Sequence, residues 1–183
     1  MSRVILLDRD GVINVDSPDY IKTADEWQPI PGSLDAIRRF NAAGYKVGVC
    51  TNQSGVGRGL MSATALSRIH AKMARELDRC GGWLDAVLFC PHAPEVGCSC
   101  RKPAPGMLRD ALVAFAASPE DACFVGDSER DLQAALAATI EPLLVRTGNG
   151  TLTEQTLPQD HNIRCFDDLA ALADGLLDDQ TGA

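Results

Sequence analysis

The chain has 183 residues, of which 45% are hydrophobic and 5% aromatic, and its 17 basic and 25 acidic residues give a net charge of −8. A chain of this length can bury a core without disulfides, and its acidic balance with few aromatic residues argues against nucleic acid as a partner. It shows no apolar run of membrane-spanning length and no signal peptide at its N-terminus, so we expect a cytoplasmic protein that does not act at a membrane.

Short apolar runs of strand length alternate with longer segments of helical periodicity. The strand-like runs cover residues 4–7, 47–50, 87–90, 123–125 and 143–145. Apolar residues at helical spacing mark residues 34–41, 65–77, 107–116, 132–138 and 169–177. This alternation predicts a single α/β domain over 1–177, with a doubly wound, mainly parallel sheet flanked by helices and a polar tail at 178–183.

Two irregular segments interrupt this rhythm, one at residues 14–31 and the other at 91–105. Loops of this length in a compact domain are often functional. Each is too short to form a separate cap domain, so we expect an open site whose substrate is selected by these loops.

The first strand ends in Asp8-Arg9-Asp10-Gly11. Two carboxylates two residues apart can share a cation, and a carboxylate can also attack phosphorus as a nucleophile. The alternatives are a turn with solvated aspartates and a purely metal-binding pair. The buried strand directly before Asp8 and the glycine directly after Asp10 favour a catalytic role.

Polar residues also follow the later strands. The hydroxyl and amide groups of 51–55 (TNQSG) suit phosphate oxygens, although the segment alone is also a plain polar turn. Lys102 can neutralise a phosphoryl group, or it can be a solvated charge before a helix. Asp127 can bind a cation, or it can cap a helix together with Ser128.

Cys90, at the edge of the second loop, and His92, Cys98 and Cys100 within it form a C-x-H…C-x-C pattern, which marks a candidate zinc-binding loop at 90–100. One imidazole and three thiolates make a closed set of four ligands, which suits structural zinc. The alternatives are a buried strand cysteine at 90 and a strained disulfide between 98 and 100. If zinc binds here, we expect it to stiffen the loop and fix Arg101 and Lys102 just beyond it.

The order Asp-x-Asp, Thr, Lys and Asp at successive strand ends resembles the haloacid dehalogenase superfamily of aspartyl phosphatases. DRDGVIN at 8–14, TNQSG at 51–55, CPH at 90–92, CSCRKPAPGM at 98–107 and FVGDSERDLQAA at 124–135 resemble its subfamily of heptose-bisphosphate and histidinol-phosphate phosphatases. The resemblance spans nearly the whole chain. It implies the Rossmannoid fold of that superfamily and zinc at the four cysteine and histidine positions.

The resemblance also implies a mechanism. Asp8 attacks phosphorus and forms an aspartyl-phosphate, while Asp10 gives a proton to the leaving group and later takes one from water. Mg²⁺ is bound by the carboxylates of Asp8 and Asp127 and by the carbonyl of Asp10. Asp131 lies at the spacing of a residue that supports the metal site, and Ser128 stands where some relatives have lysine.

Substrate contacts follow from the same resemblance. Thr51, Asn52 and Lys102 are expected to stabilise the transferring phosphoryl oxygens, with Gln53 and Ser54 beside them. Arg101 is expected to bind the rest of the substrate or a second phosphate. Asp16 and Tyr20 lie in the segment expected to contact the sugar.

The expected activity is Mg²⁺-dependent removal of the 7-phosphate of D-glycero-D-manno-heptose 1,7-bisphosphate, a step towards ADP-heptose and the lipopolysaccharide core. The NQSG and RKPAPGM stretches and the absence of a second biosynthetic domain favour this substrate. Histidinol phosphate is the alternative substrate, and a zinc-stabilised binding module without activity is the alternative of a different class. We expect the protein to be a monomer.

Overall fold

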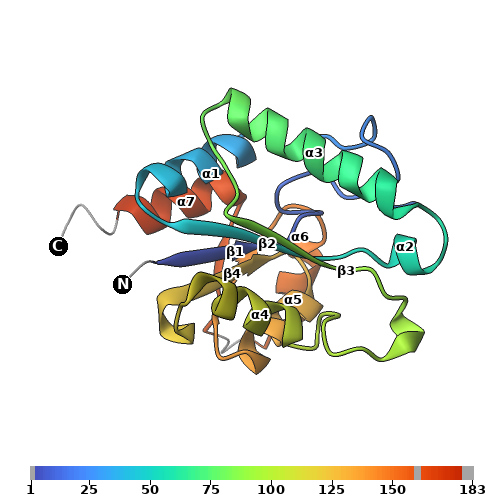
Figure 1. The fold of residues 1–183 in the computed structure, drawn as a ribbon. Coiled ribbons are helices and arrows are strands. Elements are labelled where there is room, and N and C mark those ends of the chain that lie inside the picture. Colours follow the sequence, from blue (N-terminus) through green and yellow to red (C-terminus); the bar gives the residue numbers. More distant parts are fainter. Residues whose placement is uncertain (1–2, 159–161, 179–183) are drawn as a thin grey trace.

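The computed structural model describes residues 3–158 and 162–178. Its centre is a six-stranded parallel sheet in the order β3-β2-β1-β4-β5-β6 (Figure 1). The strands are β1 (Val4–Leu7), β2 (Lys46–Asn52), β3 (Ala86–Cys90), β4 (Ala122–Gly126), β5 (Glu141–Val145) and β6 (Arg164–Phe166). From β1 the sheet grows first on one side, through β2 and β3. The chain then crosses back to add β4, β5 and β6 on the other side of β1.

Helices cover both faces of the sheet (Figure 1). One face carries α1 (Ser33–Ala42), α3 (Ala63–Arg79) and α7 (Leu169–Asp178), and the other carries α4 (Gly106–Phe115) and α5 (Glu129–Ala137). The shorter elements are α2 (Ser54–Gly57), η1 (Pro94–Val96), η2 (Pro119–Asp121) and α6 (Gly150–Thr156). The predicted doubly wound α/β fold is confirmed.

Side-chain alternation along the strands builds a core on each face. Ile5 and Leu7 join the core under α1, α3 and α7, whereas Val4 and Leu6 join the core against α4 and α5. All four side chains are at most 1% exposed. A strand buried on both faces reads as a continuous apolar run, which is why β1 is evident in the sequence.

The predicted strands and long helices agree with the structure, and the differences lie in shorter elements and at the C-terminal end. The strand β6 was not predicted, because Arg-Cys-Phe contains neither an apolar run nor clear alternation. The helical turns α2 and α6 were not predicted either. The predicted polar tail begins inside α7, which continues to Asp178, and residues 179–183 lie outside the described residues.

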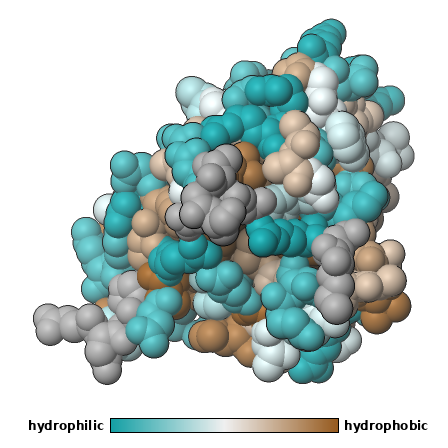
Figure 2. All heavy atoms as spheres, turned by 90° about the vertical axis from the view of Figure 1, so that its left-hand side faces the viewer, coloured by the Kyte–Doolittle hydropathy of each residue, from teal (hydrophilic) through white to brown (hydrophobic). Residues whose placement is uncertain are grey.

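The segments 8–32 and 91–105 are loops apart from η1, in keeping with the predicted absence of a cap domain. In the part of the chain that is described, no helix has the length and apolar character needed to cross a membrane. Figure 2 views the molecule from the side on which β1 begins, where hydrophilic residues predominate around smaller hydrophobic patches. The predicted site residues lie at the other end of the sheet.

Candidate active site

The parallel register brings the predicted strand ends together. Leu7 pairs with Val49 of β2 and with Val125 of β4, so the residues that follow these strands emerge side by side. They open into a cavity of about 390 Å³. Every predicted catalytic, substrate-binding and magnesium residue lines this cavity: Asp8, Asp10, Asp16, Tyr20, Thr51, Asn52, Gln53, Ser54, Arg101, Lys102 and Asp127.

Asp8 and Lys102 form a buried ion pair at the base of the cavity. The Lys102 Nζ lies 2.9 Å from Asp8 Oδ2 and 2.7 Å from Asp131 Oδ1. The side chain of Lys102 is 1% exposed and that of Asp8 is 13% exposed. The two carboxylates raise the pKa of Lys102 despite its burial, so this side chain remains a cation beside the expected nucleophile.

Asp127 is held on the other side of Asp8 by the loop after β5. Its Oδ2 accepts hydrogen bonds from the backbone N–H of Asn149 at 2.7 Å and from Asn149 Nδ2 at 3.1 Å. Gly11 and Gly148 pack directly on this carboxylate, and a methyl group on either residue would overlap it. Both glycines also have positive φ, so other residues would be strained there.

The carboxylates fit a divalent cation. Asp8, Asp127 and Asp131 each offer an oxygen, and these oxygens lie within 4.8 Å of one another. With the Lys102 ammonium, three ionised carboxylates leave a net charge of −3 + 1 = −2, which one divalent cation would neutralise. A hard cation such as Mg²⁺ prefers oxygen ligands of this kind.

The same crowding raises carboxylate pKa values in the absence of a cation. Burial, together with the neighbouring aspartates, raises the pKa of Asp8 to about 7 against the opposing effect of Lys102. Burial likewise raises the pKa of Asp127 to about 6, although the hydrogen bonds from Asn149 oppose the shift. A bound cation would favour the ionised form of both groups.

Asp10 points into the same cavity, and side chains behind it hold its carboxylate. Arg9 contacts both of its oxygens, Asn14 Nδ2 donates to Oδ1 at 2.9 Å and Gln53 Nε2 donates to Oδ2 at 3.0 Å. Arg9 and Asn14 were not predicted as site residues. The prediction for Asp10 as a metal ligand concerned its carbonyl oxygen and stays a prediction.

The last residues of β2 and the residue after it are engaged in internal hydrogen bonds. Gln53 Nε2 donates to Thr51 Oγ1 at 2.9 Å, which leaves the Thr51 hydroxyl proton available to a phosphate oxygen. Asn52 exchanges two hydrogen bonds with the backbone of Lys102, at 3.1 and 3.0 Å. Gln53 therefore holds the Thr51 side chain and Asn52 holds the backbone of Lys102, in addition to lining the cavity.

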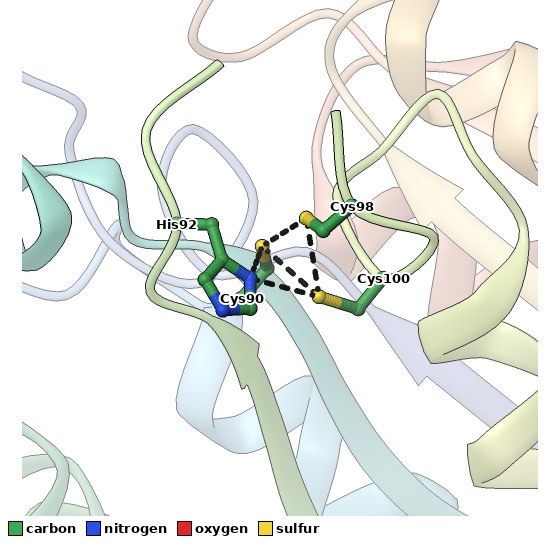
Figure 3. A group of neighbouring side chains, drawn as sticks. All are labelled: Cys90, His92, Cys98 and Cys100. Atoms are coloured by element: carbon green, nitrogen blue, oxygen red, sulfur yellow. Dashed lines mark hydrogen bonds between the residues drawn. The ribbon is translucent and has the colours of Figure 1, made fainter. Parts of the chain in front are cut away.

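Cys90, His92, Cys98 and Cys100 converge beside the cavity (Figure 3). Their sulfur and Nδ1 atoms lie 3.3 to 3.5 Å apart in the pairs that are in contact. Zn–S bonds of about 2.3 Å at tetrahedral angles would place sulfurs about 3.8 Å apart, close to this arrangement. All the cysteines are free thiols, so the alternative disulfide between 98 and 100 is not formed.

Basic side chains surround the open part of the cavity. Arg101 was predicted there, and its Nη1 lies 3.5 Å from the carbonyl oxygen of His92 in the cysteine–histidine loop. Arg58 and Arg130 also line the cavity and were not predicted. Their signal in the sequence is only their position shortly after two of the predicted strand ends. Three arginines supply the local attraction for an anion that the acidic chain as a whole lacks.

The loop from Asp16 to Tyr20 closes one side of the cavity. Tyr20 has φ of 66°, a left-handed conformation that is unusual for a non-glycine residue and often marks a functional position. Asn149 Nδ2 lies 3.4 Å from Asp16 Oδ2, which links this loop to the loop that holds Asp127.

Comparison with known sequences places this site in context. A family model described as HAD-hydrolase-like matches residues 99–172. The chain is 48% identical over 176 residues to the D-glycero-beta-D-manno-heptose-1,7-bisphosphate 7-phosphatase of Pseudomonas putida, covering 96% of this chain and 99% of the relative. It is 49% identical over 179 residues to the phosphatase of the same name from Pseudomonas aeruginosa, covering 97% and 99%.

Solved structures agree with the sequence comparison. The D,D-heptose 1,7-bisphosphate phosphatase of B. bronchiseptica, complexed with magnesium and phosphate, superposes with a TM-score of 0.93 at 48% identity, covering 97% of this chain and 99% of that one. The corresponding enzyme from Burkholderia thailandensis superposes with a TM-score of 0.76 at 41% identity, covering 96% and 99%.

Proposed function

Because the chain belongs to the heptose-1,7-bisphosphate 7-phosphatase family of HAD-like hydrolases, we propose that it removes the 7-phosphate from D-glycero-β-D-manno-heptose 1,7-bisphosphate. It is a phosphoric monoester hydrolase, which sets aside the alternative of a binding module without activity. The names of the relatives favour the heptose substrate over histidinol phosphate. The observation that carries the mechanism is the buried cluster of Asp8, Lys102 and Asp127 at the base of the cavity.

The reaction proceeds in two displacements at phosphorus. An Asp8 carboxylate oxygen attacks phosphorus, the bond from phosphorus to the sugar oxygen breaks, and Asp10 gives its proton to the departing alkoxide. Water then attacks the aspartyl-phosphate, Asp10 takes a proton from that water, and the bond from phosphorus to Asp8 breaks. Both aspartates return to their starting states, and inorganic phosphate is released.

The polar residues around Asp8 stabilise the transferring group. Lys102 holds the nucleophile and faces the phosphoryl oxygens as a cation, and Thr51 donates its hydroxyl proton to them. Mg²⁺ held by Asp8 and Asp127, with the Asp10 carbonyl as a further ligand, would offset the repulsion between an anionic nucleophile and an anionic phosphate. The cavity arginines, Arg101 first among them, suit the second phosphate of the substrate.

Zinc is the second metal of the proposal. The four ligand atoms of the cysteine–histidine cluster already lie at nearly tetrahedral spacing and leave no open position for a substrate. We assign zinc a structural role, which is to hold the segment that delivers Arg101 and Lys102 to the cavity.

The test is phosphate release with Mg²⁺ from the β heptose bisphosphate and from histidinol phosphate at equal concentrations. We expect preference for the heptose substrate, with heptose 1-phosphate as the product. The Asp8→Asn substitution should reduce turnover by at least about 10³-fold, because it removes the nucleophile. Asp110→Asn, at an exposed position on α4, is the matched control and should retain full activity. Preference for histidinol phosphate would overturn the substrate, and an active Asp8→Asn variant would overturn the mechanism.

A further inference from the structure

Arg9 is a charged residue with no access to solvent. Its side chain is 0% exposed and lies behind Asp10, on the side away from the cavity. An arginine buried without good partners strongly destabilises a protein. Its contacts therefore indicate what the residue contributes, and its burial excludes direct contact with a substrate.

The donors of the Arg9 guanidinium converge mainly on one carboxylate. Nε lies 3.0 Å from Asp10 Oδ1, and Nη2 lies 2.9 Å from Oδ1 and 3.0 Å from Oδ2. Nη2 also donates to Gln53 Oε1 at 3.1 Å. A planar fork of this kind fixes both the position and the rotation of a carboxylate, which a lysine cannot do.

The remaining donor of Arg9 faces α3. Nη1 lies 3.4 Å from His70 Nε2. Burial, and the adjacent guanidinium, lower the pKa of His70 to about 4, so the ring is neutral and offers its Nε2 lone pair to Arg9. His70 also packs edge-on against Phe89 of β3, with ring centroids 5.8 Å apart. The guanidinium is thus anchored from α3 as well as from the end of β2.

We propose that Arg9 is a positioning residue that fixes the side chain of Asp10 for both of its proton transfers. The proposal rests on the proposed function, in which Asp10 protonates the leaving alkoxide and later accepts a proton from water. Asn14 and Gln53 add two hydrogen bonds to the same carboxylate, but only Arg9 contacts both of its oxygens. Without Arg9, the Asp10 carboxylate would keep one hydrogen bond on each oxygen but would lose the fork that fixes its rotation towards the reacting oxygen.

Leaving-group chemistry separates this role from a merely structural one. An alkoxide needs a proton in order to depart, whereas p-nitrophenolate is a weak base and departs without one. The first displacement on p-nitrophenyl phosphate therefore needs Asp8 but not Asp10. The second displacement needs Asp10 with either substrate, because water must be deprotonated. Loss of Asp10 positioning should slow alkyl ester cleavage and hydrolysis of the aspartyl-phosphate, and spare release of nitrophenolate.

The experiment compares Arg9→Met and Arg9→Lys with the unmodified chain, with Mg²⁺ saturating. In Arg9→Met we expect kcat on the heptose bisphosphate to fall about 100-fold or more, within the usual range for a general acid, with KM changed less than about threefold. Nitrophenolate should appear in a rapid burst of one equivalent per site at a rate close to that of the unmodified enzyme. Arg9→Lys keeps a cation and should recover part of the lost turnover. Arg68→Met, an exposed arginine on α3, is the control.

Two outcomes would overturn the inference. One is an unchanged ratio, in both Arg9 variants, of the single-turnover rate of heptose bisphosphate cleavage to the rate of the nitrophenolate burst. The other is an equal fall in the burst amplitude, in the rate of heptose bisphosphate cleavage and in the rate of nitrophenolate release, because a loss of folded enzyme gives this pattern. If Arg9→Met does not fold, the same ratio measured in Arg9→Lys decides. Failure of the unmodified chain to cleave the heptose bisphosphate would count against the proposed substrate only. The Arg9 role would then be read from nitrophenyl phosphate against phenyl phosphate, whose leaving group is more basic.

Discussion

Each key carboxylate in this site is held by a residue that is far away in the sequence. Asp127 accepts two hydrogen bonds from Asn149, which lies on a loop after a different strand. Asp8 forms an ion pair with the ammonium group of Lys102. Groups that hold a metal ligand from behind fix its orientation and its ionised form. The properties of these two carboxylates, which we propose as Mg²⁺ ligands, therefore depend on residues from other parts of the chain.

At the same scale, we predict that Asn149→Ala raises the Mg²⁺ concentration for half-maximal activity by about 10–100-fold. The substitution removes the Nδ2 donor to Asp127 and leaves the ligand itself in place. The rate at saturating Mg²⁺ should change much less. A Mg²⁺ titration of phosphate release measures both quantities, with Gln155→Ala, an exposed amide on α6, as the control. An unchanged Mg²⁺ requirement would show that Asn149 does not support the cation site.

The loop between β3 and α4 lacks a hydrophobic core of its own. Residues 91–105 contain only the short η1, and most of their side chains are partly or fully exposed. The loop is instead held by its convergent cysteines and histidine and by a contact with α2, where the Gly57 N–H donates to the carbonyl oxygen of Pro91 at 2.8 Å. A side chain at position 57 would overlap the backbone at Pro91 and Ala93, so only glycine fits this contact.

For this loop, we predict that Cys98→Ser abolishes stoichiometric zinc binding and lowers kcat, because Arg101 and Lys102 follow directly after the cluster. We expect a loss of about 2–3 kcal/mol in the free energy of unfolding, which corresponds to a fall in Tm of roughly 5–10 °C for a chain of this size. Metal content, Tm and phosphate release are the measurements. Cys165→Ser, outside the cluster, should match the unmodified protein. Unchanged folding and turnover after zinc removal would contradict the structural role.

In the molecule as a whole, the carboxylate cluster opposes folding when no cation is bound. The raised pKa values of Asp8 (about 7) and Asp127 (about 6) mean that the folded protein binds more protons than the unfolded chain between about pH 4 and pH 7. The contribution of these groups to stability therefore falls as pH rises through this range. Lys102 moderates the effect but does not cancel it, and Asp131 and Asp10 add to it.

We accordingly predict that Mg²⁺ raises Tm more at pH 8 than at pH 5.5. At low pH, protons occupy the ligands and compete with the cation, so the apparent Mg²⁺ affinity should be at least about tenfold weaker. Thermal unfolding at each pH, with Mg²⁺ and with a chelator, gives the difference directly. Asp127→Asn should abolish the Mg²⁺-dependent shift at both pH values. A shift of the same size at pH 5.5 and pH 8 would contradict the prediction.

The grouping of site residues at the strand ends could be predicted from one geometric rule. Carboxyl ends of parallel strands meet at a single edge of the sheet, so Asp8, Thr51 and Asp127 could be placed together from strand assignment alone. Lys102 could be added because it follows the loop after the third strand. The resemblance to known phosphatases supplied the expected role of each residue.

The remaining site residues have no comparable signal. Arg9 lies between two aspartates and would ordinarily be taken for a solvated charge, since its burial depends on α3 and the end of β2. Asn149 lies in a Gly-Asn-Gly turn, and its contact with Asp127 depends on the pairing of β5 with β4. Such roles follow from tertiary contacts, which local sequence patterns do not encode. The predicted monomeric state stays a prediction.

The position of β1 at the centre of the sheet has a consequence for synthesis. As the chain leaves the ribosome, β1 can pair with β2 early, but its other edge has no partner until β4 at residues 122–126 has been made. At about 5–20 residues per second, that edge of Val-Ile-Leu-Leu stays open for several seconds. Unpaired apolar edges are the surfaces through which nascent chains aggregate. The proposed Mg²⁺ ligand Asp127 is synthesised after β4, so Mg²⁺ binding there cannot protect this edge during the interval. The strand that precedes the proposed nucleophile therefore depends on a chaperone, or on slow aggregation, until β4 is made.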